Sequence, residues 1–552
     1  MLIRWISLLL LLVPSLSHAL VDQRQAEPLH ALVLRGDEGG QLDVSQSEGL
    51  ELYALFLPGP EQLLEKRLRP LFMNRRLSSD LIERLKTEIV LFYRAYHHPI
   101  VSIYVPEQDV TNGVLQLQVV EGRLGAISSK GGRFFSGKRL KKQLHLAPGS
   151  TIDTEKLEEN LAWINRNPFR TVDAYFAPGQ APGTTDIKLE MCDEFPLQLF
   201  AGADNTGNEV TGFARWFTGF TWGNVFGLDQ TLTYQYTTAT HLRDFQSHSL
   251  FYAIPLPWRN ELRFFGGYAR SHPHLIDFHS TGTFSQASAR YAIPIQRCGA
   301  YHEFVVGFDY KNTNTNVIFI GEEDLAVIAS YVNLSQFMAS YSYARDSDVL
   351  KFLFDVELFC SPGRLLSDES NELYSALSPG AQVDYLYGDL DIATTWCLPH
   401  KHALFLQARV QLSNHTLLPS EQFGLGGYDT VRGYEEHEFN ADEAFCFNAE
   451  IRSRPFSIFR FFRMRCVDDR FYFLLFFDYG LGHLKNRSSI TEFVNANPQI
   501  KSYEYLMGFG PGFRYSISDY LTARCDWGIK LHHPSFDGGS RSMFHLGLIL
   551  SY

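Results

Sequence analysis

Arg432 is the residue whose chemistry first needs an explanation. It lies in GLGGYDTVRGYEEHEFNADEAFCFNAEIR (residues 424–452), which begins as a glycine-rich loop and ends as an alternating, strand-like segment. A guanidinium is always charged, and its N–H groups form a fork that matches the two oxygens of a carboxylate. Arg432 should therefore face water or fold inward against an acidic side chain.

Side-chain alternation places one such acid, Asp478, in the segment RFYFLLFFDYGLG (residues 470–482). One face of this strand-like segment is wholly apolar and carries Phe471, Phe473, Leu475, Phe477 and Tyr479. Asp478 lies on the other face, with Tyr472, Leu474, Phe476 and Gly480. A buried guanidinium and carboxylate pair through two hydrogen bonds, so Arg432 and Asp478 are candidate partners. Alternation alone equally allows Asp478 to be one of many solvated, inward-facing acids.

No other group of residues has the spacing of an enzyme site. Neither G-x-S-x-G nor H-E-x-x-H occurs in the chain. The segment nearest to a phosphate-binding loop is GRFFSGKR, in which Arg139 stands where Ser or Thr must hold the metal. Glu435, Glu436 and Glu438 are better explained as a solvated loop than as a carboxylate site. We therefore expect no enzyme activity, no cofactor and no nucleotide.

Composition argues against two further classes of site. The net charge of -12 argues against a nucleic-acid partner, which requires a basic surface. His97 and His98 follow a predicted helix and are expected at the surface rather than as metal ligands. No metal site is expected at the cysteines, because all seven lack C-x-x-C spacing: Cys192, Cys298, Cys360, Cys397, Cys446, Cys466 and Cys525.

Residues 1–19 have the pattern of a secretory signal peptide. Arg4 supplies the positive charge, SLLLLLV the apolar region, and Ser17-His18-Ala19 a small-x-small cleavage site. Residues 20–47 are an N-terminal segment in which prolines and glycines interrupt any amphipathic helix. No later apolar run approaches the length of a membrane-spanning helix. We expect export, and membrane insertion would have to use strands.

Residues 48–194 repeat one small α+β unit, a helix followed by a hairpin, in domains of residues 48–124 and 125–194. In the first domain, Ser78 or Ser79 should cap a helix whose apolar positions are Leu81, Ile82, Leu85, Ile89, Leu91 and Phe92. Two strands joined by an Asn112-Gly113 turn follow this helix. In the second domain, DTEKLEENLAWINRNPF is helical until Pro168, and two strands follow.

From residue 195 to residue 552 helix signals vanish, and apolar side chains alternate with polar ones. A soluble sandwich could show the same alternation. The export signal, the aromatic residues near strand ends and an apolar last strand favour an outer-membrane barrel instead. At about 9–11 residues a strand, this region has room for roughly sixteen antiparallel strands. In such a wall a lipid-facing arginine would cost about 2–4 kcal/mol, so Arg432 must avoid lipid.

Several segments resemble one family, in the family's order along the chain. VPEQDVTNGVLQLQVVEGRLGAI and INRNPFRTVDAYFAPGQAPGTTDIKL resemble the first and second POTRA domains of two-partner-secretion transporters, the haemolysin-activator and filamentous-haemagglutinin transporter family. AGADNTGNEVTGFARWFTGFTWGNVFGLD resembles the start of that family's barrel. VRGY, followed by a strand that carries FxDxG, resembles the wider outer-membrane assembly and translocation superfamily, in which such a loop folds back into the barrel.

The resemblance implies roles for individual residues. The tip of the translocation loop is Val431, Arg432, Gly433 and Tyr434, and its barrel seat is Phe476, Asp478 and Gly480. POTRA domains bind clients by strand addition, so the edges of the strands around Val101–Val105 and Val114–Val120 are candidate sites, although Val114 to Val120 also read as core. The implied client-binding residues are Val105, Pro106, Gln108, Asp109, Gly113, Glu121, Gly122, Asn167, Pro168 and Phe169.

The function that the resemblance implies is secretion of another protein. The POTRA domains would bind an unfolded exoprotein in the periplasm, and the barrel would pass it across the outer membrane. The expected partners are this exoprotein and outer-membrane lipid, without nucleic acid or nucleotide. One alternative is an insertase for other barrels, although such proteins typically carry more POTRA repeats than the two legible here. Another is a passive porin or nutrient receptor, which needs neither VRGY nor periplasmic modules.

Overall fold

A computed structural model describes residues 27–36, 47–208, 211–272, 274–275, 278–297, 299–319, 325–463, 467–485, 502–534 and 540–552. The predicted signal peptide and most of the predicted N-terminal segment lie outside the described residues. The chain folds as two compact units, and the second comprises Gly131–Gln143, Ala162–Val172 and Met191–Tyr552. None of the described helices has the length and apolar character needed to cross a membrane.

The first unit contains a four-stranded sheet in the order β2-β1-β4-β3. β1 pairs in parallel with β2 and β4, and β3 pairs antiparallel with β4. The expectation that the strand around Val114–Val120 offers an edge is wrong, because β4 lies inside the sheet: β1 pairs with Val114–Gln118 on one side and β3 with Gln118–Glu121 on the other. The edge strands are β2 and β3. The elements are β1 (Ala31–Arg35), β2 (Gly49–Tyr53), α1 (Glu61–Phe72), α2 (Ser79–Ala95), β3 (Val101–Tyr104) and β4 (Val114–Glu121).

The helix predicted after Ser78 is α2, and its sequence explains its position. The Ser78 hydroxyl accepts a hydrogen bond from the Leu81 N–H at 3.2 Å, which satisfies one of the free donors of the first turn. The buried face repeats at helical spacing, with Leu81, Leu85, Ile89 and Phe92 in the core against α1 and the sheet. Leu91, expected on this face, is 44% exposed.

The predicted second helix-and-hairpin repeat is present. Its sheet has the order β5-β7-β6. Pro168 follows the end of α4, as expected, because proline cannot continue a helix. The elements are β5 (Arg123–Gly131), α3 (Gly137–Gln143), α4 (Thr154–Ile164), β6 (Arg170–Pro178) and β7 (Thr184–Asp193).

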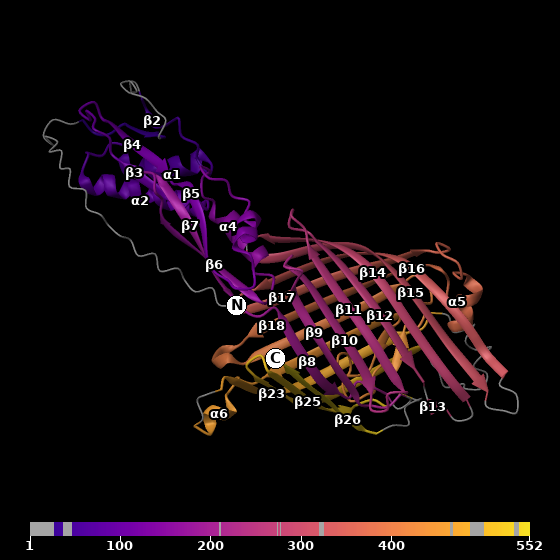
Figure 1. Ribbon diagram of the computed structural model, residues 1–552. Coiled ribbons are helices and arrows are strands. Elements are labelled where there is room, and N and C mark those ends of the chain that lie inside the picture. The colour runs from indigo at the N-terminus through magenta and orange to yellow at the C-terminus, as the bar shows by residue number, and fades with distance from the viewer. Residues whose placement is uncertain are drawn as a thin grey trace. The chain divides into compact units, whose positions relative to one another are not determined.

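The second unit contains a closed antiparallel barrel of sixteen strands and the two-residue strand β13 beside them (Figure 1). The barrel closes where β26 pairs with β8. The first half comprises β8 (Leu197–Asp204), β9 (Arg215–Val225), β10 (Gln230–Ala239), β11 (Phe245–Pro255), β12 (Glu261–Ser271), β13 (His274–Leu275), β14 (Phe278–Arg297), β15 (Ala300–Phe319) and β16 (Leu325–Asp346). The second comprises β17 (Leu350–Pro362), β18 (Asp384–Cys397), β19 (Ala403–Ser413), β22 (Glu443–Arg452), β23 (Asp469–His483), β24 (Tyr503–Ile517), β25 (Leu521–Lys530) and β26 (Ser542–Ser551).

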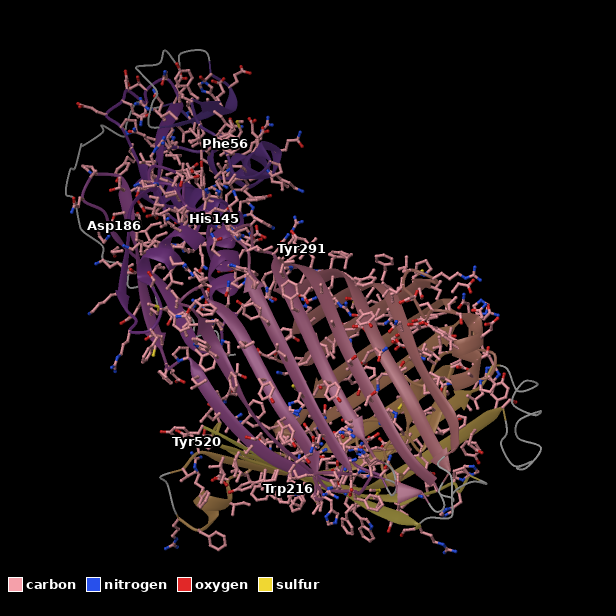
Figure 2. The ribbon with its side chains drawn as sticks, turned by 45° about the vertical axis from the view of Figure 1, so that its right-hand side comes forward. Phe56, His145, Asp186, Trp216, Tyr291 and Tyr520 are labelled. Atoms are coloured by element: carbon pink, nitrogen blue, oxygen red, sulfur yellow. The ribbon has the colours of Figure 1, made fainter. Side chains whose placement is uncertain are left out.

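Alternation sorts the barrel's side chains into an apolar outer face and a polar lumen. In β23, Phe473, Leu475 and Phe477 on the outer face are exposed. Asp478, the next residue after Phe477, lies on the opposite face and is fully buried. Large aromatic side chains lie at both ends of the wall, as in membrane barrels. Figure 2 shows Tyr291 and Trp216 at opposite ends of the strands.

The barrel region contains short helices that were not predicted. The 3-10 helix η1 (Pro399–Lys401) lies between β18 and β19. α5 (Asn371–Leu377) follows β17, and α6 (Ile458–Phe461) follows β22, at opposite ends of the barrel (Figure 1). Serine caps α5 and α6: Ser370 and Ser457 each accept an N–H from the first turn. α5 packs in a cluster with Tyr385, Tyr387, Leu417 and Leu418 through Tyr374.

Candidate functional site

The connection between β19 and β22, residues 414–442, is here called the lumenal loop. Its two sides pair as the short strands β20 (Phe423–Leu425) and β21 (Phe439–Ala441). The turn between them carries Gly426, Gly427 and Gly433 at φ values near +100°, a conformation that glycine adopts without a steric penalty. Val431, Arg432 and Tyr434 at the tip are buried, with exposures of 0%, 3% and 0%. The hairpin therefore folds into the barrel rather than outward.

The structure brings Arg432 and Asp478 together inside the barrel. Arg432 Nε donates to Asp478 Oδ2 at 2.7 Å, and Nη2 donates to Oδ1 at 2.9 Å. The backbone N–H of Arg432 also donates to Asp478, at 3.1 Å, and the side-chain amide of Asn448 donates at 2.8 Å. Asp478 thus accepts four hydrogen bonds and holds both the side chain and the main chain of the loop tip.

Two further acids face the same guanidinium. Arg432 Nη1 donates to Glu450 on β22 at 2.7 Å and to Asp526 on β25 at 3.4 Å. Asp526 is itself paired with Arg514 through contacts of 2.6 and 2.9 Å, and Glu450 is paired with Arg452. The network therefore balances three arginines against three carboxylates. Balance is required at this depth, because a buried charge without a partner costs several kcal/mol.

Glycines in the barrel wall allow the loop backbone to lie directly on it. A Cβ at Gly508 would lie 2.0 Å from the Arg432 carbonyl oxygen, and a Cβ at Gly528 would lie 2.2 Å from the Gly433 nitrogen. The Gly433 N–H donates to Nε2 of His545 on β26 at 2.9 Å. A larger residue at either glycine would push the tip away from the wall.

The rest of the predicted barrel seat also contacts the tip. The Phe476 ring lies 3.7 Å from the Arg432 guanidinium carbon, in cation–π geometry. A Cβ at Gly480 would lie 2.8 Å from the Val431 side chain. All seven predicted loop and seat residues therefore lie in one site, whereas the roles assigned to them in transport stay predictions.

A second anchor holds the stem of the lumenal loop. Glu421 is 4% exposed and accepts two hydrogen bonds from Lys311 Nζ on β15, at 2.7 and 2.9 Å. Gln336 on β16 and Tyr387 on β18 donate to the same carboxylate at 3.1 and 2.7 Å. The loop is thus fastened to the wall at two separate charge clusters.

Sequence reasoning missed several residues of the site. Glu450 and Asn448 lie on the inward face of a strand that alternation identified. Alternation does not, however, show how far along the barrel axis an inward-facing residue lies, or whether it reaches the loop tip. That level follows from register: Asn448 pairs with Asp478 across β22 and β23. No pattern in the sequence pointed to four further residues of the site: Asp526, Arg514, His545 and Glu421.

Most of the residues predicted to bind clients in the first POTRA-like domain have intramolecular partners. The Gln108 side chain donates to the Gln116 carbonyl at 2.8 Å and accepts the Gln116 N–H at 2.7 Å, so it completes the edge of β4 beyond β3. Asp109 accepts the Thr111 N–H at 2.9 Å. Glu121 lies 3.6 Å from His98. Gly113 sits at a turn with φ +72°, Pro106 and Gly122 flank β3 and β4, and Val105 is 41% exposed.

The predicted residues Asn167, Pro168 and Phe169 precede β6 and belong to the second unit. Asn167 donates to the Gly223 carbonyl at 2.6 Å and to Asp229 at 3.0 Å. The Phe169 ring occupies the space that a Cβ at Gly223 would fill. The neighbouring Arg170 pairs with Asp229 at 2.7 Å. Client binding by these residues stays a prediction, and their observed partners lie within the second unit.

Among the described residues, no cluster of His, Cys, Asp or Glu has the arrangement of a metal site. Five cysteines within the described ranges are free thiols: Cys192, Cys360, Cys397, Cys446 and Cys525. Cys298 and Cys466 lie outside those ranges.

Comparisons with known proteins match most of the chain to the family that its sequence segments resemble. Residues 183–514 match the family described as "Haemolysin secretion/activation protein ShlB/FhaC/HecB", and residues 52–122 match the POTRA domain of ShlB type. The outer membrane transporter CdiB of Dickeya dadantii is 23% identical over 66% of this chain and 65% of its own length. The heme/hemopexin transporter protein HuxB of Haemophilus influenzae is 20% identical over 87% of this chain and 82% of its own length.

Solved structures show the same fold. CdiB from Escherichia coli aligns over 98% of this chain and 93% of its own, with a TM-score of 0.74 and 15% identity. BamA from Haemophilus ducreyi, lacking POTRA domains 1–3, aligns with a TM-score of 0.51 and 12% identity. The barrel lies in the outer membrane, with POTRA domains in the periplasm. Because the family match covers more than half of its residues, this chain belongs to the family of haemolysin secretion/activation proteins ShlB/FhaC/HecB.

Proposed function

We propose that this protein secretes an unfolded exoprotein across the outer membrane. The observation that carries this proposal is the lumenal loop: its tip is buried in a charge-balanced network on the inner wall of the barrel. A chain of exoprotein in the lumen would compete for the space that the loop fills. The Arg432 network would thus define the resting state of the pore, and displacement of the loop would accompany transport.

Binding of the exoprotein would begin at the POTRA domains, between residues 48 and 194. The two edges of the first sheet, β2 and β3, carry unpaired backbone groups that can add a client strand. Tyr104 and Val105 at the end of β3 are 56% and 41% exposed. A cavity of about 250 Å³ on the same unit is lined by Phe56, His98 and Glu121 among others. The strand edges would supply affinity through main-chain hydrogen bonds, and the cavity would supply selectivity by accepting client side chains.

The POTRA-like region offers the direct test of this function. Cells would produce the chain together with a candidate exoprotein, and the exoprotein would be measured in the medium. A variant lacking residues 48–194 should still insert as a heat-modifiable barrel but secrete no exoprotein. The full chain carrying Arg67→Gln, an exposed substitution on α1, serves as control and should secrete normally. Secretion at the normal rate by the deletion variant would instead identify a passive pore.

A further inference from the structure

The connection between β22 and β23 differs from the barrel's other connections at the same end, because it carries α6 and a run of aromatic and basic residues. It lies at the end of the wall where the chain enters the barrel: Asp469 pairs with Ile517, Leu521 with Leu550, and Leu550 with Ala201 on β8. Figure 1 shows α6 at this end and α5 at the other. The connection therefore lies at the periplasmic end of the barrel.

Its described side chains combine two chemistries. Phe456 and Phe462 are 45% and 67% exposed. Arg454, Arg460 and Arg463 are exposed as well, and none of the three makes an ion pair with any residue in the described ranges. Exposed aromatic rings and guanidinium groups without an ion-pair partner in the described ranges therefore lie together on one short segment.

Residues 453–456 extend the barrel wall beyond β22, because Ser453 and Phe456 pair with the backbone of β23. Odd-numbered side chains of β23 face outward, as the exposed Phe473 and Leu475 show. Phe456 pairs with Phe471 through two backbone hydrogen bonds of 2.9 and 2.8 Å. The Phe456 ring lies 5.2 Å from the ring of Phe471 and 6.3 Å from that of Phe473. The segment thus continues the membrane-facing surface of the wall.

A buried acid holds the segment in this position. Asp469 also points outward, yet it is only 2% exposed because the segment covers it. Its carboxylate accepts the Ile458 N–H at 2.8 Å, the Phe459 N–H at 3.4 Å and the Ser457 hydroxyl. These bonds satisfy the free donors of the first turn of α6. The aromatic and basic side chains are therefore presented on an ordered support.

We propose that residues 454–463 form an interfacial anchor that binds anionic phospholipid in the periplasmic leaflet of the outer membrane. Phe456 and Phe462 would enter the leaflet at the depth of the headgroups, where aromatic side chains are favoured. Arg454, Arg460 and Arg463 would bind lipid phosphates. Two observations select lipid as the partner: the segment is continuous with the lipid-facing wall, and its unbalanced positive charge complements an anionic headgroup.

Lipid selectivity of the full chain tests the arginines. Detergent-purified protein would be offered equal amounts of phosphatidylglycerol and phosphatidylcholine, and bound lipids would be counted by native mass spectrometry. The wild-type chain should prefer phosphatidylglycerol. The variant Arg454→Gln/Arg460→Gln/Arg463→Gln should lose this preference by about tenfold or more, because each basic residue near a membrane surface contributes about 1 kcal/mol. The matched control Arg67→Gln/Arg76→Gln/Arg84→Gln removes the same charge from exposed positions of the first unit and should keep the preference.

Depth of insertion tests the aromatic side chains independently. In nanodiscs, lipids brominated near the headgroup should quench the added fluorescence of the Phe462→Trp variant more than lipids brominated at the chain end. The same comparison on the wild-type chain supplies the background of its native tryptophans. Absence of added quenching would place residue 462 in water or against another protein and would overturn the proposal. Quenching without a phosphatidylglycerol preference would overturn the assignment of the arginines to anionic headgroups.

Discussion

Arg432 on the lumenal loop and Asp478 on β23 form a buried ion pair through two hydrogen bonds of 2.7 and 2.9 Å. Asp478 also accepts the backbone N–H of Arg432, so one carboxylate fixes both the charge and the main chain of the loop tip. Removal of either partner leaves the other without its main compensation in a site that excludes most water. The ion pair is therefore the feature on which the position of the loop depends.

Enlarging the glycine beneath the tip should displace the loop without changing any charge. In Gly528→Ala the new Cβ would lie 2.2 Å from the Gly433 nitrogen and 2.6 Å from the Arg432 carbonyl carbon, so the backbone must move. We expect a larger resting conductance in planar bilayers than for the wild-type chain. Gly266→Ala in β12 is the matched control, because its nearest neighbouring atom lies 3.9 Å away. Equal conductance of the two variants would show that the tip does not depend on this contact.

The Lys311–Glu421 pair at the stem of the lumenal loop should act independently of the Arg432–Asp478 pair at its tip. Glu421→Gln leaves the Lys311 ammonium, whose side chain is only 13% exposed, without its charge partner. The stem of the loop should then become sensitive to protease added to the purified chain. Adding Lys311→Met removes the unpaired charge and should restore part of the resistance. Lys351→Met, at an exposed pair with Asp346, should have little effect. If the double variant were as sensitive as Glu421→Gln alone, the loss would not arise from an unpaired charge.

Asp193 should make the turn before α3 sensitive to acid. Burial alone would raise the pKa of Asp193, but hydrogen bonds from the backbone N–H groups of Arg133, Phe134 and Phe135 outweigh it and hold that pKa below its usual value. A depressed carboxyl pKa stabilises the fold above the unfolded value of about 3.9, and this contribution is lost as pH falls through the folded value. Protection of these three amides against hydrogen exchange should therefore hold from pH 7 to 5 and decline below about pH 4.

The substitution Asp193→Asn should weaken this protection at pH 7 and remove its dependence on pH. Asp173→Asn, at an exposed position on β6, is the control and should leave the profile unchanged. An unaltered acid transition in Asp193→Asn would assign the transition to another group.

Periodicity predicted the parts of this fold that depend on local sequence. The helical spacing after Ser78 predicted α2, and alternation predicted that Asp478 faces inward. The edge assignment of Val114–Val120 failed because it depends on β1, which lies far away in sequence. Glu450 and Asp526 were missed for the same reason: their common level around Arg432 is set by strand register. α6 was missed because a single capped turn is too short to show a helical period.

The most direct test of the Arg432–Asp478 pairing is a double-mutant cycle on secretion. The rate of exoprotein release would be measured for the wild-type chain, Arg432→Ala, Asp478→Ala and the double variant, with Arg67→Ala as an exposed control. Breaking a buried pair typically costs about 3–5 kcal/mol, and water in the lumen reduces this cost, so each single variant should release the exoprotein about tenfold or more slowly. The account predicts that the double variant is little slower than either single variant. Fully additive losses would show that the two residues act independently and would contradict it.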